Sequence, residues 1–258
     1  MHIVLRSLFI VIFGISLPTH LQAGPIAIDL KLHKSAIVSG EPLYIIAYVK
    51  NIGATPIGIG YGNSPSYANG KGWGNVMMAK EGASYSRWSD NMRVIDKVSP
   101  QSLAPLQILT NSYVICANDA GDGCISPAFI NPGVYQIKLE YLLSSRDIAV
   151  SEPVKVEVKA PLDNDESVWN SALSNRLFWL LMQAPWEVDA GTGKVPGLAE
   201  KLPNVKGSVY WQYLALGIGR SLSYQGRRDE AQKFFNLAKE AADNEFVRHA
   251  ADKYGQVR

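Results

Sequence analysis

A glycine-rich stretch of aromatic side chains offers the clearest binding chemistry in this sequence. Residues 58–88 interleave glycine and asparagine with five aromatic candidates: Tyr61, Tyr67, Trp73, Tyr85 and Trp88. Glycine and asparagine favour turns, so we expect a long loop here, and long loops are often functional. Aromatic rings beside amides suit the faces of sugars or anchor a protein partner. The alternative is that Trp73 and Trp88 cap a hydrophobic core, because tryptophan is seldom fully solvated.

The cysteines form a second candidate group. The chain has 2 cysteines, Cys116 and Cys124, on either side of a short, turn-rich segment. Their spacing does not fit a CxxC redox pair, and a thiol nucleophile would need a histidine, for which only His33 and His249 follow the first 23 residues. In an oxidising compartment an even pair predicts a structural disulfide, which here would contribute about 2.5 kcal/mol.

Sequence motifs for common enzyme chemistries are missing. There is no HExxH, no phosphate-binding glycine loop, and no histidine in a recognisable triad setting. Asn118, Asp119 and Asp122 could offer oxygens to calcium, but their spacing matches no EF-hand and such residues commonly only form turns. We therefore expect a non-enzyme without cofactor or metal. Sequence spacing does not test for a carboxylate pair assembled by folding.

The first 23 residues predict export. A positively charged start precedes the apolar residues 10–17, and Leu21-Gln22-Ala23 offers a small-residue cleavage site. This pattern is typical of a secretory signal peptide, and the apolar part is short for a membrane span; an uncleaved anchor is the alternative. We expect a periplasmic or extracellular protein with no membrane span after signal cleavage.

Charge and composition exclude one class of partner. The formal net charge is +2, and the composition is ordinary for a globular protein, with 47% hydrophobic and 19% charged residues. A dedicated nucleic-acid binder would show a basic stripe, so no nucleic-acid partner is expected.

Alternating patterns predict a β-rich region before residue 160. A run of strand-favouring residues, 43–50, lies between the turn at residues 39–42 and a second turn at residues 51–53. Residues 26–33, 135–141 and 154–159 alternate cleanly, with His33 on the polar, solvated face. Seven or so short strands of this kind predict an antiparallel β-sandwich.

One motif within this region carries a family resemblance. Residues 131–137, Asn-Pro-Gly-Val-Tyr-Gln-Ile, resemble the tyrosine corner of immunoglobulin-like domains, with Ile137 where antibody domains carry the second core cysteine. Cys116 and Cys124 lie too close together to be the bridge between sheets. The resemblance is therefore to the broad immunoglobulin-like superfold of bacterial secreted proteins, over about residues 25–160, and it implies a fold rather than a function.

The remaining residues predict helices and a second resemblance. Helical spacing covers residues 165–184, 208–224, 228–243 and 245–254. Five residues stand at the mutual spacing of a tetratricopeptide repeat: Gly219, Gly226, Ala231, Phe235 and Ala238. Ala215 and Asp243 depart from the family's tryptophan and proline. The resemblance covers one repeat, which implies either a helical hairpin packed on its neighbours or a peptide-binding groove.

These observations predict an α+β protein of two domains: a signal peptide (1–23), an N-terminal antiparallel immunoglobulin-like β-sandwich (24–160) and a C-terminal α-helical, tetratricopeptide-like domain (161–258). We expect a secreted or periplasmic protein that engages a protein partner through its aromatic loop or its C-terminal helices. Two alternatives are a carbohydrate-recognition module that uses loop 58–88 for a glycan, and a peptidase or hydrolase inhibitor that presents the loop between the cysteines. A buried ionisable cluster in a concave pocket would instead favour an enzyme.

Overall fold

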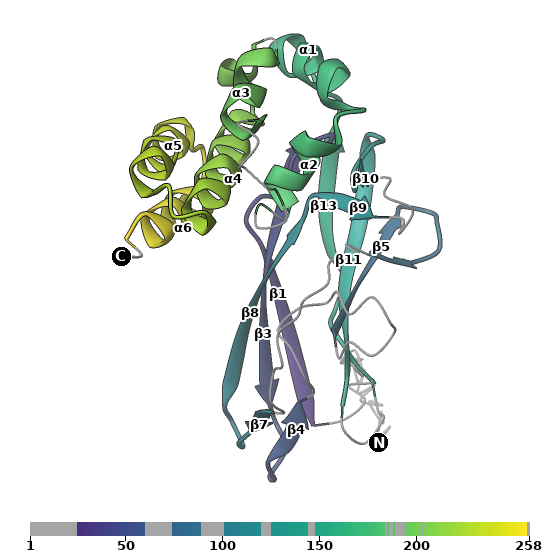
Figure 1. The fold of residues 1–258 in the computed structure, drawn as a ribbon. Coiled ribbons are helices and arrows are strands. Elements are labelled where there is room, and N and C mark those ends of the chain that lie inside the picture. The colour runs from purple at the N-terminus through teal and green to yellow at the C-terminus, as the bar shows by residue number, and fades with distance from the viewer. Residues whose placement is uncertain are drawn as a thin grey trace, which may run out of the picture.

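The computed structural model shows a β-rich body with helices packed over one end of it (Figure 1). It describes residues 25–59, 74–88, 101–119, 125–143, 148–183, 185, 188, 194–202 and 204–256. Strands occupy the chain up to Lys159, and helices begin at Asp163. The expected α+β class is confirmed at this level.

Two sheets make up most of the β-rich body. The first has the order β1-β3-β8 and is antiparallel, with strands β1 (Ile26–Leu32), β3 (Leu43–Asn51) and β8 (Ile108–Ile115). The second has the order β2-β13-β11-β5-β6, with strands β2 (Ala36–Val38), β13 (Val154–Lys159), β11 (Gly133–Leu142), β5 (Gly74–Lys80) and β6 (Ser86–Arg87).

Three short pairings complete the β-rich body. Strand β12 (Ile148–Val150) pairs with the far part of β11, beyond the stretch that pairs with β13. Two small antiparallel pairs join β4 (Ile57–Ile59) to β7 (Gln101–Leu103) and β9 (Ala117–Asp119) to β10 (Ile125–Pro127). The pairing of β2 with β13 is parallel, so the expectation of a purely antiparallel sandwich was wrong at that edge.

Both large sheets contribute to one hydrophobic core. Ile45 and Tyr113 from the first sheet and Ile137 and Val156 from the second belong to the same cluster of buried side chains. In β11 the buried and half-buried residues alternate, as a strand with one covered face requires. Tyr135 lies at the start of this strand, and its hydroxyl donates a 2.8 Å hydrogen bond to the carbonyl of Asn131.

Six α-helices follow the strands among the described residues: α1 (Asp163–Ala172), α2 (Arg176–Gln183), α3 (Lys194–Lys201), α4 (Trp211–Tyr224), α5 (Arg228–Ala241) and α6 (Glu245–Gly255). The single helix expected over residues 165–184 is broken into α1 and α2. The side chain of Asn175 caps the start of α2 by accepting a hydrogen bond from the backbone N–H of Phe178. The break lets Trp179 pack edge-on against Trp169.

Helix α4 forms the centre of the helical region. All of residues 211–219 are buried, and α4 packs against α2, α5 and α6. At Gly217 an added β-carbon would overlap the backbone carbonyl of Leu181, so α2 passes directly over this glycine. At Gly219 an added β-carbon would lie 2.7 Å from the ring of Phe235 on α5. The expected close contact of these helices is present, and Ala231 and Ala238 are buried beside it.

The helices do not have a core of their own. Their hydrophobic cluster includes Tyr44, Cys116 and Ala117, which belong to or border the strands. Gly40, in the turn between β2 and β3, lies under the rings of Trp169 and Trp179 and has φ +77°. The helical region is therefore packed onto the end of the sheets by close side-chain contacts.

The expected disulfide is not found. Cys116 is a free thiol and is fully buried among the helices. Its backbone N–H donates to the side chain of Gln183 on α2, and burial raises the pKa of its thiol far above the usual range. Cys124 lies outside the described residues. The sequence prediction rested on compartment and spacing, and it missed that the helices enclose Cys116.

Candidate functional site

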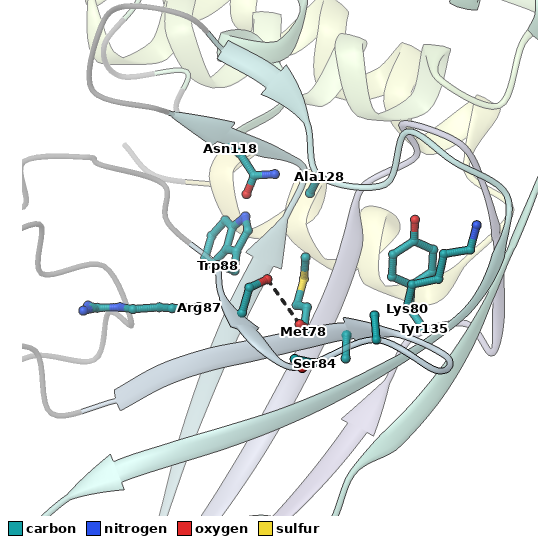
Figure 2. Close-up of a pocket in the computed structure, with 11 residues that line it drawn as sticks. Met78, Lys80, Ser84, Arg87, Trp88, Asn118, Ala128 and Tyr135 are labelled. Atoms are coloured by element: carbon teal, nitrogen blue, oxygen red, sulfur yellow. Dashed lines mark hydrogen bonds between the residues drawn. The ribbon is translucent and has the colours of Figure 1, made fainter.

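A pocket of about 420 Å³ opens beside the β5–β6 hairpin. Its apolar lining includes Met78, Trp88, Ala128 and Tyr135 (Figure 2). Serine, asparagine and backbone groups add polar atoms, and the serine hydroxyl of Ser86 donates to the carbonyl of Met78 at 3.4 Å. Concave sites with an apolar lining and a few polar groups are the usual places for ligands.

The charged groups of this pocket are both cationic. Lys80 and Arg87 belong to the lining, and none of the lining residues carries a carboxylate. In Figure 2 the two side chains lie on opposite sides, with Trp88 and Met78 between them. The stem of Lys80 crosses Gly133, where an added β-carbon would lie 2.6 Å from its Cε atom. The nearby Glu81 is paired with Lys155 at 3.3 Å instead.

The structure separates the two predicted aromatic candidates that it describes. Trp88 is only 3% exposed, and its indole N–H donates to the carbonyl of Ala117 at 3.1 Å. Tyr85 instead donates its hydroxyl to Gln136 at 2.8 Å and lies under the ammonium of Lys138. They do not form one flat platform, and Trp88 belongs to the sheet core. Tyr61, Tyr67 and Trp73 lie outside the described residues.

The residues considered as oxygen donors for calcium are described only in part. Asn118 lines the pocket, whereas Asp122 lies outside the described residues. No group of three or more histidine, cysteine, aspartate or glutamate side chains is placed to hold a metal ion among the residues that the structure describes.

A cluster of ionisable groups lies elsewhere, where the helices meet the sheets. Glu41, in the turn after β2, is only 2% exposed. Its Oε1 accepts hydrogen bonds from Tyr213 at 2.8 Å and from Lys34 at 2.5 Å, while Oε2 accepts the backbone N–H of Val38 at 2.9 Å. A buried carboxylate with three donors is satisfied, so its side chain is held in place.

His33 is held in one tautomer by the same cluster. Its Nδ1 accepts the backbone N–H of Tyr44 at 3.0 Å, which leaves the proton on Nε2, 3.3 Å from the hydroxyl of Tyr213. Burial, and then the positive charge of Lys34, lower the pKa of His33 to about 4. The sequence prediction of a solvated histidine was wrong, because the helices cover the face on which it lies.

Lys34 connects the sheet end to the last helices. Its ammonium lies 2.6 Å from Asp243, between α5 and α6, as well as beside Glu41. Burial by itself would lower the pKa of Lys34, but the two carboxylates outweigh it and raise the pKa. Burial would also raise the pKa of Asp243, and the bonds from Lys34, Asn244 and Gln212 lower it overall.

This cluster has the chemistry of a structural junction. None of its ionisable residues, His33, Lys34, Glu41, Tyr213 and Asp243, is among those that line the pocket. Each has a hydrogen-bonding or charged partner within the cluster. The pocket and the ionisable groups are thus separate, and the described residues do not combine them into a catalytic constellation.

Sequence reasoning missed the residues that line the pocket and a glutamine that joins α2 to the strands. Nothing in the spacing of Met78 and Lys80 marks a pocket. Gln183 was also missed: its amide oxygen accepts the backbone N–H groups of Cys116 and Ala117, and its amide nitrogen donates to the carbonyl of Val114. Buried polar residues inside an apolar helix were the one available signal, since burial requires partners.

Comparisons with known proteins give only weak likenesses. No protein-family model matches the chain, and no curated protein matches it. Solved structures similar to part of the chain include the sporulation control protein Spo0M from Bacillus subtilis. The TM-score is 0.33 and the sequence identity is 13%, and the match covers 57% of this chain and 54% of Spo0M. The CARDB domain of PF1109 from Pyrococcus furiosus, solved in complex with di-metal ions, matches with a TM-score of 0.28 and 14% sequence identity. This match covers 52% of this chain and 87% of that domain.

A third match is the alkylpurine DNA glycosylase AlkC from Pseudomonas fluorescens, bound to DNA containing an abasic site analogue. Here the TM-score is 0.34 and the identity 10%, over 53% of this chain and 31% of that one. The match to Spo0M spans only about half of that protein. At these TM-scores the likeness is too weak to show a shared function.

Proposed function

We propose that this chain is a secreted or periplasmic binding protein, not an enzyme, and that it engages a protein partner at the pocket beside the β5–β6 hairpin. The observation that carries this proposal is the pocket itself: an apolar lining with a cationic residue on each of two sides. The buried Glu41 and the half-buried His33 have their hydrogen-bonding partners at the helix–sheet junction instead.

The burial of α4 favours the pocket over a groove on that helix as the binding surface. A peptide groove requires a helix that presents one face to the partner. Helix α4 presents none along residues 211–219, because α2, α5, α6 and the end of the sheets cover it. The C-terminal helices are therefore proposed as a structural support for the sheets.

The finer fold assignment belongs to the same proposal. The hydrogen bond from Tyr135 to Asn131 is the one that a tyrosine corner makes, and it supports an immunoglobulin-like sandwich. The contact of Gly219 with Phe235 supports a tetratricopeptide-like hairpin of α4 and α5, with Gly226 at φ +75° in the turn. One hairpin packed on its neighbours fits this geometry better than a repeat array.

The two alternative functions have less support. A carbohydrate platform needs open ring faces, but Trp88 is buried and the ring of Tyr85 has Lys138 over it at 4.7 Å. An inhibitor that presents a disulfide-closed loop lacks its bridge, because Cys116 is a free, buried thiol.

A pocket-blocking variant tests the proposed function. Protein from residue 24 onward serves as bait for the secreted and envelope fractions of the native host. Ala83→Trp fills the mouth of the pocket from an exposed lining position, and Ala104→Trp places the same bulk at an exposed site away from it. We expect a partner that is retained by the wild type and Ala104→Trp and lost by Ala83→Trp. Equal retention by all three baits would overturn the proposal.

A further inference from the structure

The pocket also carries information about which partner sequence it selects. We propose, building on the function proposed above, that it binds an acidic peptide segment: one apolar side chain enters the pocket, and a carboxylate beside it pairs with Lys80. The volume of about 420 Å³ lies toward the small end of the range for ligand sites, which suits one or two side chains.

The apolar part of this specificity comes from the side chains at the centre. Met78 is 8% exposed, Trp88 3% and Tyr135 9%, so each offers a part of its surface to the pocket while the rest is packed in the core. The indole N–H of Trp88 is already bonded to Ala117. The centre therefore rewards an apolar side chain.

The acidic part comes from the charge of the lining. Lys80 is an exposed cation of the lining, and none of the described lining residues carries a carboxylate, so the potential beside Lys80 favours a negative partner. Lys80 is exposed and has no ion-pair partner in the part of the chain that the structure describes. Its stem lies across Gly133 beside Tyr135, which places the charge at the side of the pocket rather than in its apolar centre (Figure 2).

The geometry of an extended peptide determines at which position in the peptide the carboxylate residue must lie. In an extended segment, residues two positions apart point to the same face. An apolar side chain in the pocket therefore leaves the residues two positions before and after it on the same face, where one of them can reach Lys80. The expected motif is an apolar residue with glutamate or aspartate two positions away.

Matched peptides test this inference. The probes are acetyl-Glu-Ala-Leu-Ala-Glu-amide and the same peptide with both glutamates replaced by glutamine, titrated into the full chain from residue 24. Binding is followed through the indole N–H signal of Trp88 in nitrogen–proton correlation spectra. We expect the glutamate peptide to bind about fivefold more tightly, and added salt to reduce the difference.

Two lysine variants locate the effect. Lys80→Met should bring the two peptides to nearly equal affinity. Lys155→Met removes an exposed lysine that pairs with Glu81 and does not line the pocket, and it should keep the full difference. Equal binding of both peptides by the wild type would overturn the acidic specificity while leaving the proposed function standing.

Two further results of the titrations would also contradict the inference. If neither peptide moves the Trp88 signal, the acidic-peptide inference fails. The proposed function is tested separately by the bait experiment, and it fails if Ala83→Trp still retains the partner. If glucuronate shifts the signal and the peptides do not, the pocket selects an acidic sugar and the peptide inference is wrong.

Discussion

The hydroxyl of Tyr213 on α4 donates a 2.8 Å hydrogen bond to Oε1 of Glu41, which lies 172 positions earlier in the sequence. Glu41 belongs to the turn that joins β2 to β3, and Tyr213 belongs to the most buried helix. The same hydroxyl is 3.3 Å from His33 Nε2. One side chain thus joins the central helix to two parts of the sheet end.

Removing this hydroxyl should weaken the junction. In Tyr213→Phe the buried carboxylate of Glu41 loses one of its donors, and we expect the free energy of unfolding to fall by about 2 kcal/mol. Tyr48→Phe, in a half-buried tyrosine of β3, should change it by less than about 0.5 kcal/mol. Urea denaturation measures both, and equal effects would contradict the role of the Tyr213–Glu41 bond.

His33 predicts a loss of stability in weak acid. Its pKa is about 4 in the folded chain against 6.5 for an ordinary histidine. The unfolded chain therefore binds the extra proton more readily, and the free energy of unfolding rises with pH between these values. We expect at most about 3 kcal/mol to be lost as the pH falls from 6.5 toward 4.

A matched pair of variants isolates the His33 contribution. His33→Gln removes the titrating group and should flatten the pH dependence in this window. His249→Gln changes an exposed histidine on α6 and should leave the slope as in the wild type. Urea denaturation at a series of pH values decides, and a wild-type slope in His33→Gln would contradict the assignment.

Gly217 predicts a steric requirement at the crossing of α2 and α4. An added methyl group would overlap the carbonyl of Leu181, a backbone group that cannot turn aside. We expect Gly217→Ala to lower the free energy of unfolding by about 3 kcal/mol. Gly197→Ala on α3 meets nothing within 4 Å and should be neutral or stabilise by up to about 1 kcal/mol. Thermal melts of both proteins give the comparison.

Cys116 should be chemically silent in the folded protein. Its thiol is fully buried and its pKa is raised by desolvation, so little thiolate forms and reagents have no access. We expect iodoacetamide to leave Cys116 unmodified in buffer and to alkylate it in guanidinium chloride without any reductant. A peptide containing Cys116 that reacts only after reduction would show a disulfide and contradict the structure.

The sheets should not fold well without the helices. A chain that ends at Ala160 would expose Tyr44, Cys116 and Ala117 and leave Glu41 without Tyr213. We expect this fragment to aggregate or to lack a cooperative unfolding transition, and to be recovered by co-expression of residues 161–258. A soluble fragment that unfolds cooperatively by circular dichroism would show that the helices are dispensable.

Local patterns in the sequence were enough to predict many elements. Alternation located β11 and β13, and the spacing of Gly219 and Phe235 predicted a contact that is present. These signals depend on neighbours within one element or one hairpin. The hydrogen bond from Tyr135 to Asn131 is equally local, since it spans only 4 positions.

The features that sequence reasoning missed join distant segments. Gly40 lies beneath Trp169, and Gly217 lies beneath Leu181, but neither glycine differs in sequence from one in an ordinary turn or helix. The polar face that carries His33 looked solvated because the covering helices come much later in the chain. The pocket likewise combines β5, β6, β9 and β11, and no local pattern links them.

Site-specific photo-crosslinking tests most directly whether partners bind at the pocket. A photoreactive phenylalanine analogue would replace Ala83 at the pocket in one strain and Leu237, exposed on α5, in another. Irradiation in the native host, followed by mass spectrometry, would identify any adduct. The pocket proposal predicts a specific protein adduct from position 83 and none from position 237. An adduct from position 237 alone would assign binding to the helices and contradict it.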